Sequence, residues 1–297
     1  MALSKDLKKR IDALKLEYDS LRRGKESLLD LLFEVELPEA VYNSNAIENS
    51  TLSISETERI LLDMEVSRKV SVREVFETKN LARVVEYLKT KIDARDTDKE
   101  LILLLHKMLI SNIDEKIAGR FRVPGEYVRV GTHIAPAPEK VEPMVDALLL
   151  EYSSRQSAHF AERIAQFHLG FEHIHPFCDG NGRMGRVLIN FQLMRFGFPP
   201  IIIRDKEKAA YYQSFKRYEG NGKRDPEGME KVLTLALMES LHKRIAYLSG
   251  VVIVRLSDHA KSTNEPLSTL LNKAKRQTLA AFREKGVWKI GVGHNKK

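Results

Sequence analysis

Residues 175 to 186 read His-Pro-Phe-Cys-Asp-Gly-Asn-Gly-Arg-Met-Gly-Arg, and they join two apolar stretches with helical spacing, 158–174 and 184–196. The proline ends the first helix, because its ring and its missing N–H cannot continue the hydrogen-bond ladder. A Gly-Asn-Gly turn that opens the second helix leaves backbone N–H groups unpaired at the positive end of the helix dipole. The pattern predicts an anion site, most naturally for phosphate groups.

The charged side chains of this stretch fit the same interpretation. Arg183 and Arg186 are three residues apart at the start of a helix, so they share a face and can reach the outer phosphates of a nucleotide. Asp179 lies beside the turn and offers a hard oxygen ligand for Mg²⁺. His175 is the group suited to accept a proton near neutral pH.

Two other interpretations of this stretch are weaker. A histidine at the end of an apolar helix is often structural, and His173, His175, Cys178 and Asp179 together offer ligand types that bind transition metals. Neither interpretation explains two glycines around an asparagine followed by two arginines. Two cationic groups so close would also oppose the binding of a metal cation.

The spacing His-x-Phe-x-Asp-Gly-Asn-Gly-Arg-x-x-Arg resembles the signature of Fic proteins, and every fixed position is present. The usual reaction of that family is AMP transfer from ATP to a Ser, Thr or Tyr hydroxyl of a target protein. The resemblance implies an all-α, Fic-type helical bundle with a short β-hairpin flap. It also implies that ATP and Mg²⁺ are bound, that His175 is the base on the target hydroxyl, and that Asp179 holds the metal.

The resemblance further assigns residues that bind the nucleotide, with Phe177 as a core anchor of the loop. These residues are Gly180, Asn181 and Gly182 for the phosphates, and Arg183 and Arg186 for the β and γ phosphates. Relatives transfer phosphate or phosphocholine, so another donor remains an alternative. The phosphotransferase toxins of the family lack the second glycine of Gly-Asn-Gly and the arginine after it. Both are present here.

An inhibitory segment is expected upstream, at residues 42–52. Ser44 and Glu48 are four residues apart and share a helix face. Ser-x-x-x-Glu followed by Asn49 resembles the inhibitory motif of the Fic class with an N-terminal inhibitory helix. The resemblance implies that Glu48 pairs with Arg186. This pairing would occupy the guanidinium group that binds the γ phosphate, and the carboxylate would repel the nucleotide. In some members the same glutamate positions a water that removes AMP, so deAMPylation is an alternative direction.

Residues 118–138 break the helical pattern. Extended residues 127–130 lie between a Pro-Gly pair and Gly131, which predicts a short hairpin. It is either a stabilising surface hairpin or the Fic flap, whose edge would align a target segment by main-chain hydrogen bonds. Val130 and Ile134 are the apolar residues expected to clamp the target.

Adjacent tyrosines, Tyr211 and Tyr212, fall on a predicted helix over 206–219. In the family an aromatic residue in this neighbourhood lies against adenine. Adjacent helical residues point about 100° apart, so one tyrosine can face the nucleotide while the other packs. The sequence does not decide between them.

Composition limits the class of protein. The 297 residues suit one large domain or a main domain with an appendage, and 43% hydrophobic residues can form a substantial core. No apolar run approaches a membrane span, and the first residues lack an apolar secretory segment. One cysteine allows no internal disulfide, so a reducing, cytoplasmic location is expected.

The expected organisation has three parts: residues 1–95, with the inhibitory helix at about 43–50, a catalytic core over 96–250, and a basic tail over 251–297. Capping boxes predict helix starts at Ser55, Ser71 and Thr97. Either one long helix or a helix pair broken near Gly24 is predicted over residues 1–34. Its narrow apolar seam packs either on its own domain, the favoured interpretation, or in a homodimer. The members of the seam are Leu7, Ile11, Leu14, Tyr18 and Leu21.

The tail carries most of the net charge of +8, since residues 251–297 hold ten Lys/Arg and three Asp/Glu. A helix is expected over 251–261. From Pro266 onward the sequence resembles an excisionase-like helix-turn-helix followed by a short strand, with Lys275, Arg276 and Gln277 opening the second helix. The resemblance implies DNA as a partner, and a DNA-binding regulator is the rival function. A basic helical cap with Trp288 in its core is the alternative.

Overall fold

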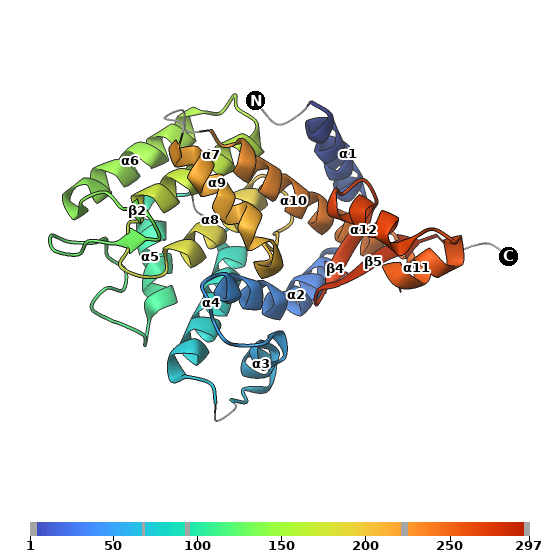
Figure 1. Ribbon diagram of the computed structural model, residues 1–297, viewed down its shortest axis with the longest axis horizontal. Helices are drawn as coiled ribbons and strands as arrows, with labels where there is room; N and C mark the ends of the chain where they lie inside the picture. Colours follow the sequence, from blue (N-terminus) through green and yellow to red (C-terminus); the bar gives the residue numbers. More distant parts are fainter. Residues whose placement is uncertain (1–4, 67–68, 93–95, 221–224, 294–297) are drawn as a thin grey trace.

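The protein is described from a computed structural model, which covers residues 5–66, 69–92, 96–220 and 225–293. It is mostly helical, as the sequence predicts (Figure 1). The helices are α1 (Lys5–Leu21), α2 (Glu26–Ile47), α3 (Ile54–Glu58), α4 (Val72–Lys91), α5 (Lys99–Ile110), α6 (Pro138–Ser154), α7 (Phe160–Ile174), α8 (Asn181–Arg195), α9 (Lys208–Gly220), α10 (Glu227–Leu248), α11 (Leu256–Thr263) and α12 (Leu267–Lys275), with a π turn η1 (Arg59–Asp63) and a 3-10 turn η2 (Asp205–Glu207).

The strands form two small antiparallel sheets. One is the hairpin β1 (Arg129–Val130) and β2 (His133–Ile134), which confirms the predicted hairpin. The other consists of β3 (Val252–Arg255), β4 (Ala281–Glu284) and β5 (Val287–Val292), in the order β3-β5-β4. Figure 1 shows the second sheet with α11 and α12 at one end of the molecule and β2 at the opposite end.

Helices α7 and α8 lie between two hydrophobic clusters. Phe171 of α7 and Met184 of α8 belong to the cluster formed with α4, α5 and α6. Leu169 and Ile189, on the same two helices, belong to the cluster formed with α1, α9 and α10. Both helices are therefore held by packing over most of their surface, which fixes the loop between them.

The N-terminal helix pair breaks at Gly24, which takes a left-handed conformation (φ 70°) as a turn between helices requires. Helix α1 packs on α10, and its seam residues Ile11 and Tyr18 are 0% and 5% exposed within the second cluster. The favoured interpretation of the seam is thus confirmed. The homodimer alternative for this seam is wrong, because the chain's own α10 covers it.

Two of the three predicted helix caps are displaced. Ser53, and not Ser55, caps α3, in a complete capping box with Glu56. Asp98, and not Thr97, caps α5 by accepting from the Leu101 N–H at 2.7 Å. Ser71 does cap α4.

The Glu74 carboxylate of α4 also anchors the segment after α2. It accepts hydrogen bonds from the Thr51 N–H at 2.7 Å and from the Ser50 hydroxyl at 3.2 Å. Burial opposes its ionisation, but these hydrogen bonds prevail and lower the pKa of Glu74 to about 2. Since the folded pKa lies below the usual value of 4.5, this stabilisation is present at neutral pH and is lost as the pH falls towards 2.

Glu74→Ala is expected to lower the free energy of unfolding by about 1 kcal/mol at pH 7, because it removes acceptors from a helix start and its neighbouring segment. The measurement is urea denaturation at pH 7 and pH 3, where the difference from wild type should shrink at the lower pH. Glu86→Ala, at an exposed position of the same helix, is the matched control. A Glu74→Ala protein as stable as the control at pH 7 would contradict this role.

The tail differs from its predicted form. Residues 252–255 are strand β3 rather than the start of a helix, and α11 follows. The expected second helix does not form: Lys275 ends α12, Gln277 has φ 54°, and residues 281–284 are strand β4. The two helices of the tail are instead α11 and α12, and both precede the position expected for the second helix. Trp288 lies on β5, half-buried beside the tail's small core.

The turn between β4 and β5 is docked on α2. The N–H groups of Lys285 and Gly286 donate to the Glu39 carboxylate at 3.0 and 3.2 Å. Glu39 also pairs with Arg204, which in turn pairs with Glu239 at 2.9 Å. Because these charges are buried, each depends on its partners. The tail is thus held against the helix that Glu48 follows.

Candidate active site

Helix α7 presents His175 directly at its C-terminal end. The His175 N–H donates to the Phe171 carbonyl at 2.9 Å, and His175 takes the left-handed conformation (φ 50°) before Pro176. The helix therefore ends at the residue before the proline, through an αL cap. This cap turns the chain into the loop that leads to α8.

The loop opens on a cavity of about 1580 Å³, including the space open to solvent. His175, Asp179, Gly182 and Arg186 line it together with Glu48, the residue that follows the end of α2. Residues from sequence positions far apart, at the end of α2 and on the hairpin, the 175–186 loop and α9, thus meet around one hollow. Such a hollow with convergent polar groups is where chemistry is expected.

The His175 ring is set to accept a proton. Its Nδ1 lies 3.2 Å from the Glu172 carbonyl oxygen, so Nδ1–H donates to that oxygen and Nε2 keeps its lone pair. Burial lowers the pKa of His175 to about 4, although the Glu172 carbonyl and Glu48 oppose that shift. The imidazole is therefore neutral at pH 7, the form that a general base needs.

This low pKa predicts how the rate of any reaction with His175 as the base depends on pH on the acidic side of neutrality. A base with a pKa of about 4 stays neutral at pH 5.5, whereas one at the ordinary 6.5 would be mostly protonated there. The rate at pH 5.5 should therefore lie within about twofold of the rate at pH 7, against a loss of about eightfold for an unshifted histidine. Initial rates measured between pH 5 and pH 8 test this; an inflection near 6.5 would contradict it.

Glu172 is a buried carboxyl that the sequence analysis did not single out. It lines the cavity, and its Oε2 lies 3.7 Å from His175 Nδ1. Burial, helped by the nearby Glu48 carboxylate, raises the pKa of Glu172 to about 8. Glu172 is thus mostly neutral at pH 7 and adds little negative charge beside the histidine.

Glycines at the start of α8 allow other groups to approach the backbone closely. Gly180 takes φ 79° before the helix begins, which favours glycine. A Cβ on Gly182 would lie 2.1 Å from Glu48 Oε1, so any larger residue would force that carboxylate to move. The first amides of α8 have no partner within the helix and form an anion-binding end.

Asn181 braces the loop from inside. Its side-chain oxygen accepts from the Phe177 N–H at 2.9 Å, and its amide nitrogen donates to the Phe177 carbonyl at 2.8 Å. Phe177 itself is fully buried and stacks on His106 at 3.6 Å between ring centroids. The polar ends of Asn181 are therefore engaged with the backbone of the loop.

Glu48 and Ser44 hold Arg186 from the N-terminal side. Arg186 Nη2 lies 2.9 Å from Glu48 Oε1 and 2.8 Å from the Ser44 carbonyl, and Nε donates to the Ser44 hydroxyl at 2.9 Å. Burial disfavours the charge, yet Glu48 keeps the pKa of Arg186 above its usual value. Asn49 follows with φ 66°, a left-handed conformation that asparagine tolerates better than most residues. We refer to the Glu48–Arg186 contact as the latch.

The comparisons with known proteins agree with this arrangement. The model of the Fic/DOC family matches residues 96–193, from just before α5 to the end of α8. The chain carries a domain of the Fic/DOC family. Glu48 at the end of α2 and the tyrosines of α9 lie outside the matched residues.

Relatives extend the likeness beyond the Fic domain. The chain is 33% identical over 177 residues to a protein adenylyltransferase Fic of Nematostella vectensis, an alignment that covers 58% of this chain and 41% of that protein. It thus spans less than half of that relative's length. A Fic domain containing signaling protein from Bacteroides thetaiotaomicron superposes with a TM-score of 0.73 at 25% identity, over 81% of this chain and 97% of that one.

One solved structure covers the tail as well. A Fic family protein from Desulfovibrio desulfuricans has a TM-score of 0.69 over 100% of this chain and 99% of its own, at 19% identity. At that identity the likeness shows the fold alone. The attachment of the tail to the Fic domain is thus a shared fold feature.

Asp179 and Arg183 form an ion cluster on the α4 side of the Fic domain. Arg183 Nη2 lies 3.2 Å from Asp179 Oδ1 and its Nη1 lies 3.2 Å from Glu77, while Arg73 also pairs with Asp179. Burial opposes ionisation of Asp179, but the two arginines keep its pKa below the usual value. Arg183 lies outside the cavity lining, so the structure brings Arg186 into the cavity without Arg183.

The two tyrosines differ in burial. Tyr211 is 1% exposed, and its hydroxyl lies 2.8 Å from His168 Nε2. Tyr212 is 39% exposed, and its hydroxyl donates to the Ile47 carbonyl at 3.0 Å. Both line the cavity, and Tyr212 is the one with an open face.

The hairpin borders the cavity through Val128, Val130 and residues 131–133. Val130 is 46% exposed and lines the cavity; Ile134 is 73% exposed and lies outside the lining. The His133 ring contacts the His173 carbonyl at 2.9 Å, which ties the hairpin to the end of α7.

Two buried residues that sequence reasoning missed support the loop. Arg122 donates to the His175 carbonyl at 2.8 Å and to the Pro136 carbonyl at 2.9 Å, which joins the hairpin to the catalytic loop. His106 accepts from the Gly119 N–H at 3.0 Å, so its Nε2–H donates to the Asp179 carbonyl at 3.1 Å. Their isolated positions in the sequence, on a loop and inside an apolar helix, gave no signal.

Neither a metal cluster nor a membrane span is found in the part of the chain that the structure describes. Within those residues, no group of three or more His, Cys, Asp or Glu side chains is placed to hold a metal ion. The transition-metal interpretation of residues 173–179 is therefore wrong. Among the same residues, no helix is long and apolar enough to cross a bilayer.

Proposed function

We propose that this chain transfers AMP from Mg·ATP to a Ser, Thr or Tyr hydroxyl of a protein, and that Glu48 restrains the transfer. The observation that supports it most is the common cavity of His175, the α8 N-terminus and Arg186. A triphosphate along the first turn of α8 would meet unpaired amides and Arg186. The protein adenylyltransferase of Nematostella vectensis supports the same activity.

In the proposed reaction His175 Nε2 takes the proton of the target hydroxyl. The hydroxyl oxygen forms a bond to the α-phosphorus while the bond from that phosphorus to the bridging oxygen breaks, and pyrophosphate leaves. His175 Nδ1–H stays on the Glu172 carbonyl, which holds the ring in position. The helix dipole and Arg186 stabilise the charge on the departing phosphates.

The residues present fit a magnesium ion. Asp179 is a partly exposed carboxylate beside the α8 N-terminus, and Mg²⁺ commonly takes one carboxylate, phosphate oxygens and waters. Arg73, the exposed partner of Asp179, would give way, while the buried Arg183 would go on orienting the carboxylate. When bound, the ion would neutralise phosphate charge.

Target recognition would use the hairpin. Val130 at the cavity and Ile134 beside it are exposed apolar residues on short strands, suited to hold an added strand of a target protein. Tyr212 is the better candidate for contact with adenine, because it has the open face. A single cysteine supports a reducing compartment such as the cytoplasm.

Removal of AMP is a second candidate for the same site. Its support is Glu48, whose side chain is 40% exposed within the cavity that holds His175, so it can bind a water there. DNA binding by the tail is a third, supported by the winged-helix-like order of β3, α11, α12, β4 and β5 and by the exposed basic residues Lys273 and Lys275. The docking of the β4–β5 turn on α2 leaves α12 as the element to contact DNA.

The experiment is to incubate the Glu48→Gly protein with Mg·ATP and a cell lysate and to measure intact masses and modified peptides. A mass gain of one AMP on a hydroxyl residue supports the proposal, and a gain of one phosphate refutes it. Gel shifts of the full chain at rising salt test the DNA alternative, since phosphate contacts weaken steeply with salt.

A further inference from the structure

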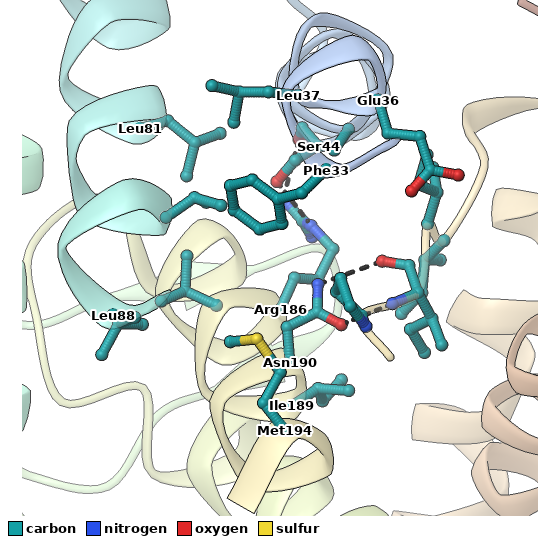
Figure 2. A pocket seen from close by; sticks show the side chains of 17 residues that line it. Phe33, Glu36, Leu37, Ser44, Leu81, Leu88, Arg186, Ile189, Asn190 and Met194 are labelled. Carbon is teal, nitrogen blue, oxygen red and sulfur yellow. Dashed lines mark hydrogen bonds between the residues drawn. The ribbon is translucent and has the colours of Figure 1, made fainter. Parts of the chain in front are cut away.

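A second, largely apolar hollow lies behind the latch. It is enclosed by α2, α4, α8 and residues 200–203, with about 820 Å³ of space including its open mouth. Its lining includes the apolar side chains of Leu37, Leu81, Leu88, Ile189 and Met194, which Figure 2 labels. Helices α2, α4 and α8 also contribute residues to the first hydrophobic cluster, so the hollow is confined to the place where these three helices meet residues 200–203.

Most polar side-chain atoms of its wall already have partners, and Arg186 Nη1 is the exception among the described lining residues. Glu36 bonds Lys243 at 3.0 Å. Asn190 exchanges two hydrogen bonds with the Ile201 backbone, at 2.8 and 3.0 Å. Arg186 is held by Ser44 and Glu48. A charged ligand would pay a desolvation cost without a counter-charge from these groups, whereas hydrocarbon would be buried favourably.

Arg186 and Ser44 also form part of this wall, and Figure 2 shows them joined by hydrogen bonds. Arg186 lines the active-site cavity as well. One guanidinium therefore separates the two hollows. Any change in the spacing of α2 and α8 at this point acts on the latch directly.

We propose that this hollow is a binding site for an uncharged, largely hydrocarbon small molecule, and that its occupancy favours the closed latch. In the structure the hollow is present together with the Glu48–Arg186 contact, and the proposed coupling is that a ligand filling it stabilises this conformation. Because the two equilibria are thermodynamically linked, opening the latch lowers the affinity for the ligand by the same factor by which the bound ligand disfavours opening. The consequence for AMP transfer rests on the proposed function; binding and its coupling to the latch do not.

The test uses the neutral fluorescent probe N-phenyl-1-naphthylamine titrated into the full chain. Saturable binding to one site is expected. Ala40→Leu on the α2 wall and Val85→Phe on the α4 wall fill the hollow from opposite sides and should each weaken binding by about tenfold. Ala13→Leu, at an exposed position of α1, should bind like wild type. Circular dichroism identifies any variant that fails to fold.

The coupling is tested with the same titration on Glu48→Gly, where the probe should bind about fivefold more weakly. Absence of saturable binding, or equal binding by wild type and both folded filling variants, overturns the site. Equal affinity in wild type and Glu48→Gly overturns the coupling. None of these readings requires catalysis, so an inactive protein would refute the proposed function without affecting this result.

Discussion

Glu48→Gly is expected to increase the initial rate of AMP incorporation by about 10- to 100-fold. The Glu48–Arg186 contact at 2.9 Å is a charge-assisted hydrogen bond, and such bonds contribute about 1.5–3 kcal/mol. Each 1.4 kcal/mol corresponds to a tenfold change in the population that can bind the triphosphate productively. Removing the carboxylate also removes the negative charge that meets the γ phosphate.

The measurement is incorporation of label from ATP radiolabelled in the α-phosphate, into the chain itself and into lysate proteins. Glu34→Gly, at an exposed position of α2, the helix that Glu48 follows, controls for the effect of glycine on this helix. Equal rates for wild type, Glu34→Gly and Glu48→Gly would show that the contact does not restrain the enzyme.

His175→Ala in the Glu48→Gly background is expected to lower the rate by about 10²- to 10⁴-fold, the usual contribution of a positioned general base. Nucleotide affinity should change little, because the α8 amides and Arg186 are untouched. His259→Ala on α11, far from the cavity in sequence and in the tail, is the control.

Both quantities are measured on the same preparations, the rate by label incorporation and the affinity by calorimetry with a non-hydrolysable ATP analogue. A rate that survives in His175→Ala, with nucleotide still bound, would place the base elsewhere. Glu172, whose Oε2 lies 3.7 Å from His175 Nδ1, is one titratable group that could replace it.

The sequence predicted the helical fold and the loop of residues 175–186, because the motif is local: its chemistry and its geometry lie in one continuous stretch. The displaced caps have a physical cause as well. Ser53 with Glu56 and Ser55 with Glu58 are overlapping capping-box patterns, and the first forms in the folded protein, where α3 packs on α2. Asp98 and Thr97 compete in the same way.

The placement of Arg183, the strands of the tail and the burial of the tyrosines depended on contacts with residues remote in sequence. Arg183 is drawn towards Glu77 of α4, which no spacing within the motif could reveal. Residues 278–284 suit a helix by composition, but pairing of β4 with β5 overrides that propensity. The hydrogen bond from Tyr211 to buried His168 decides which tyrosine packs, and it joins α9 to α7.

The most direct test of the central claim compares ATP labelled in the α-phosphate with ATP labelled in the γ-phosphate, using Glu48→Gly and its His175→Ala derivative. We expect that the α label alone becomes covalently attached to protein, and only when His175 is present. Attachment of the γ label, or of the α label at an equal rate without His175, would contradict it.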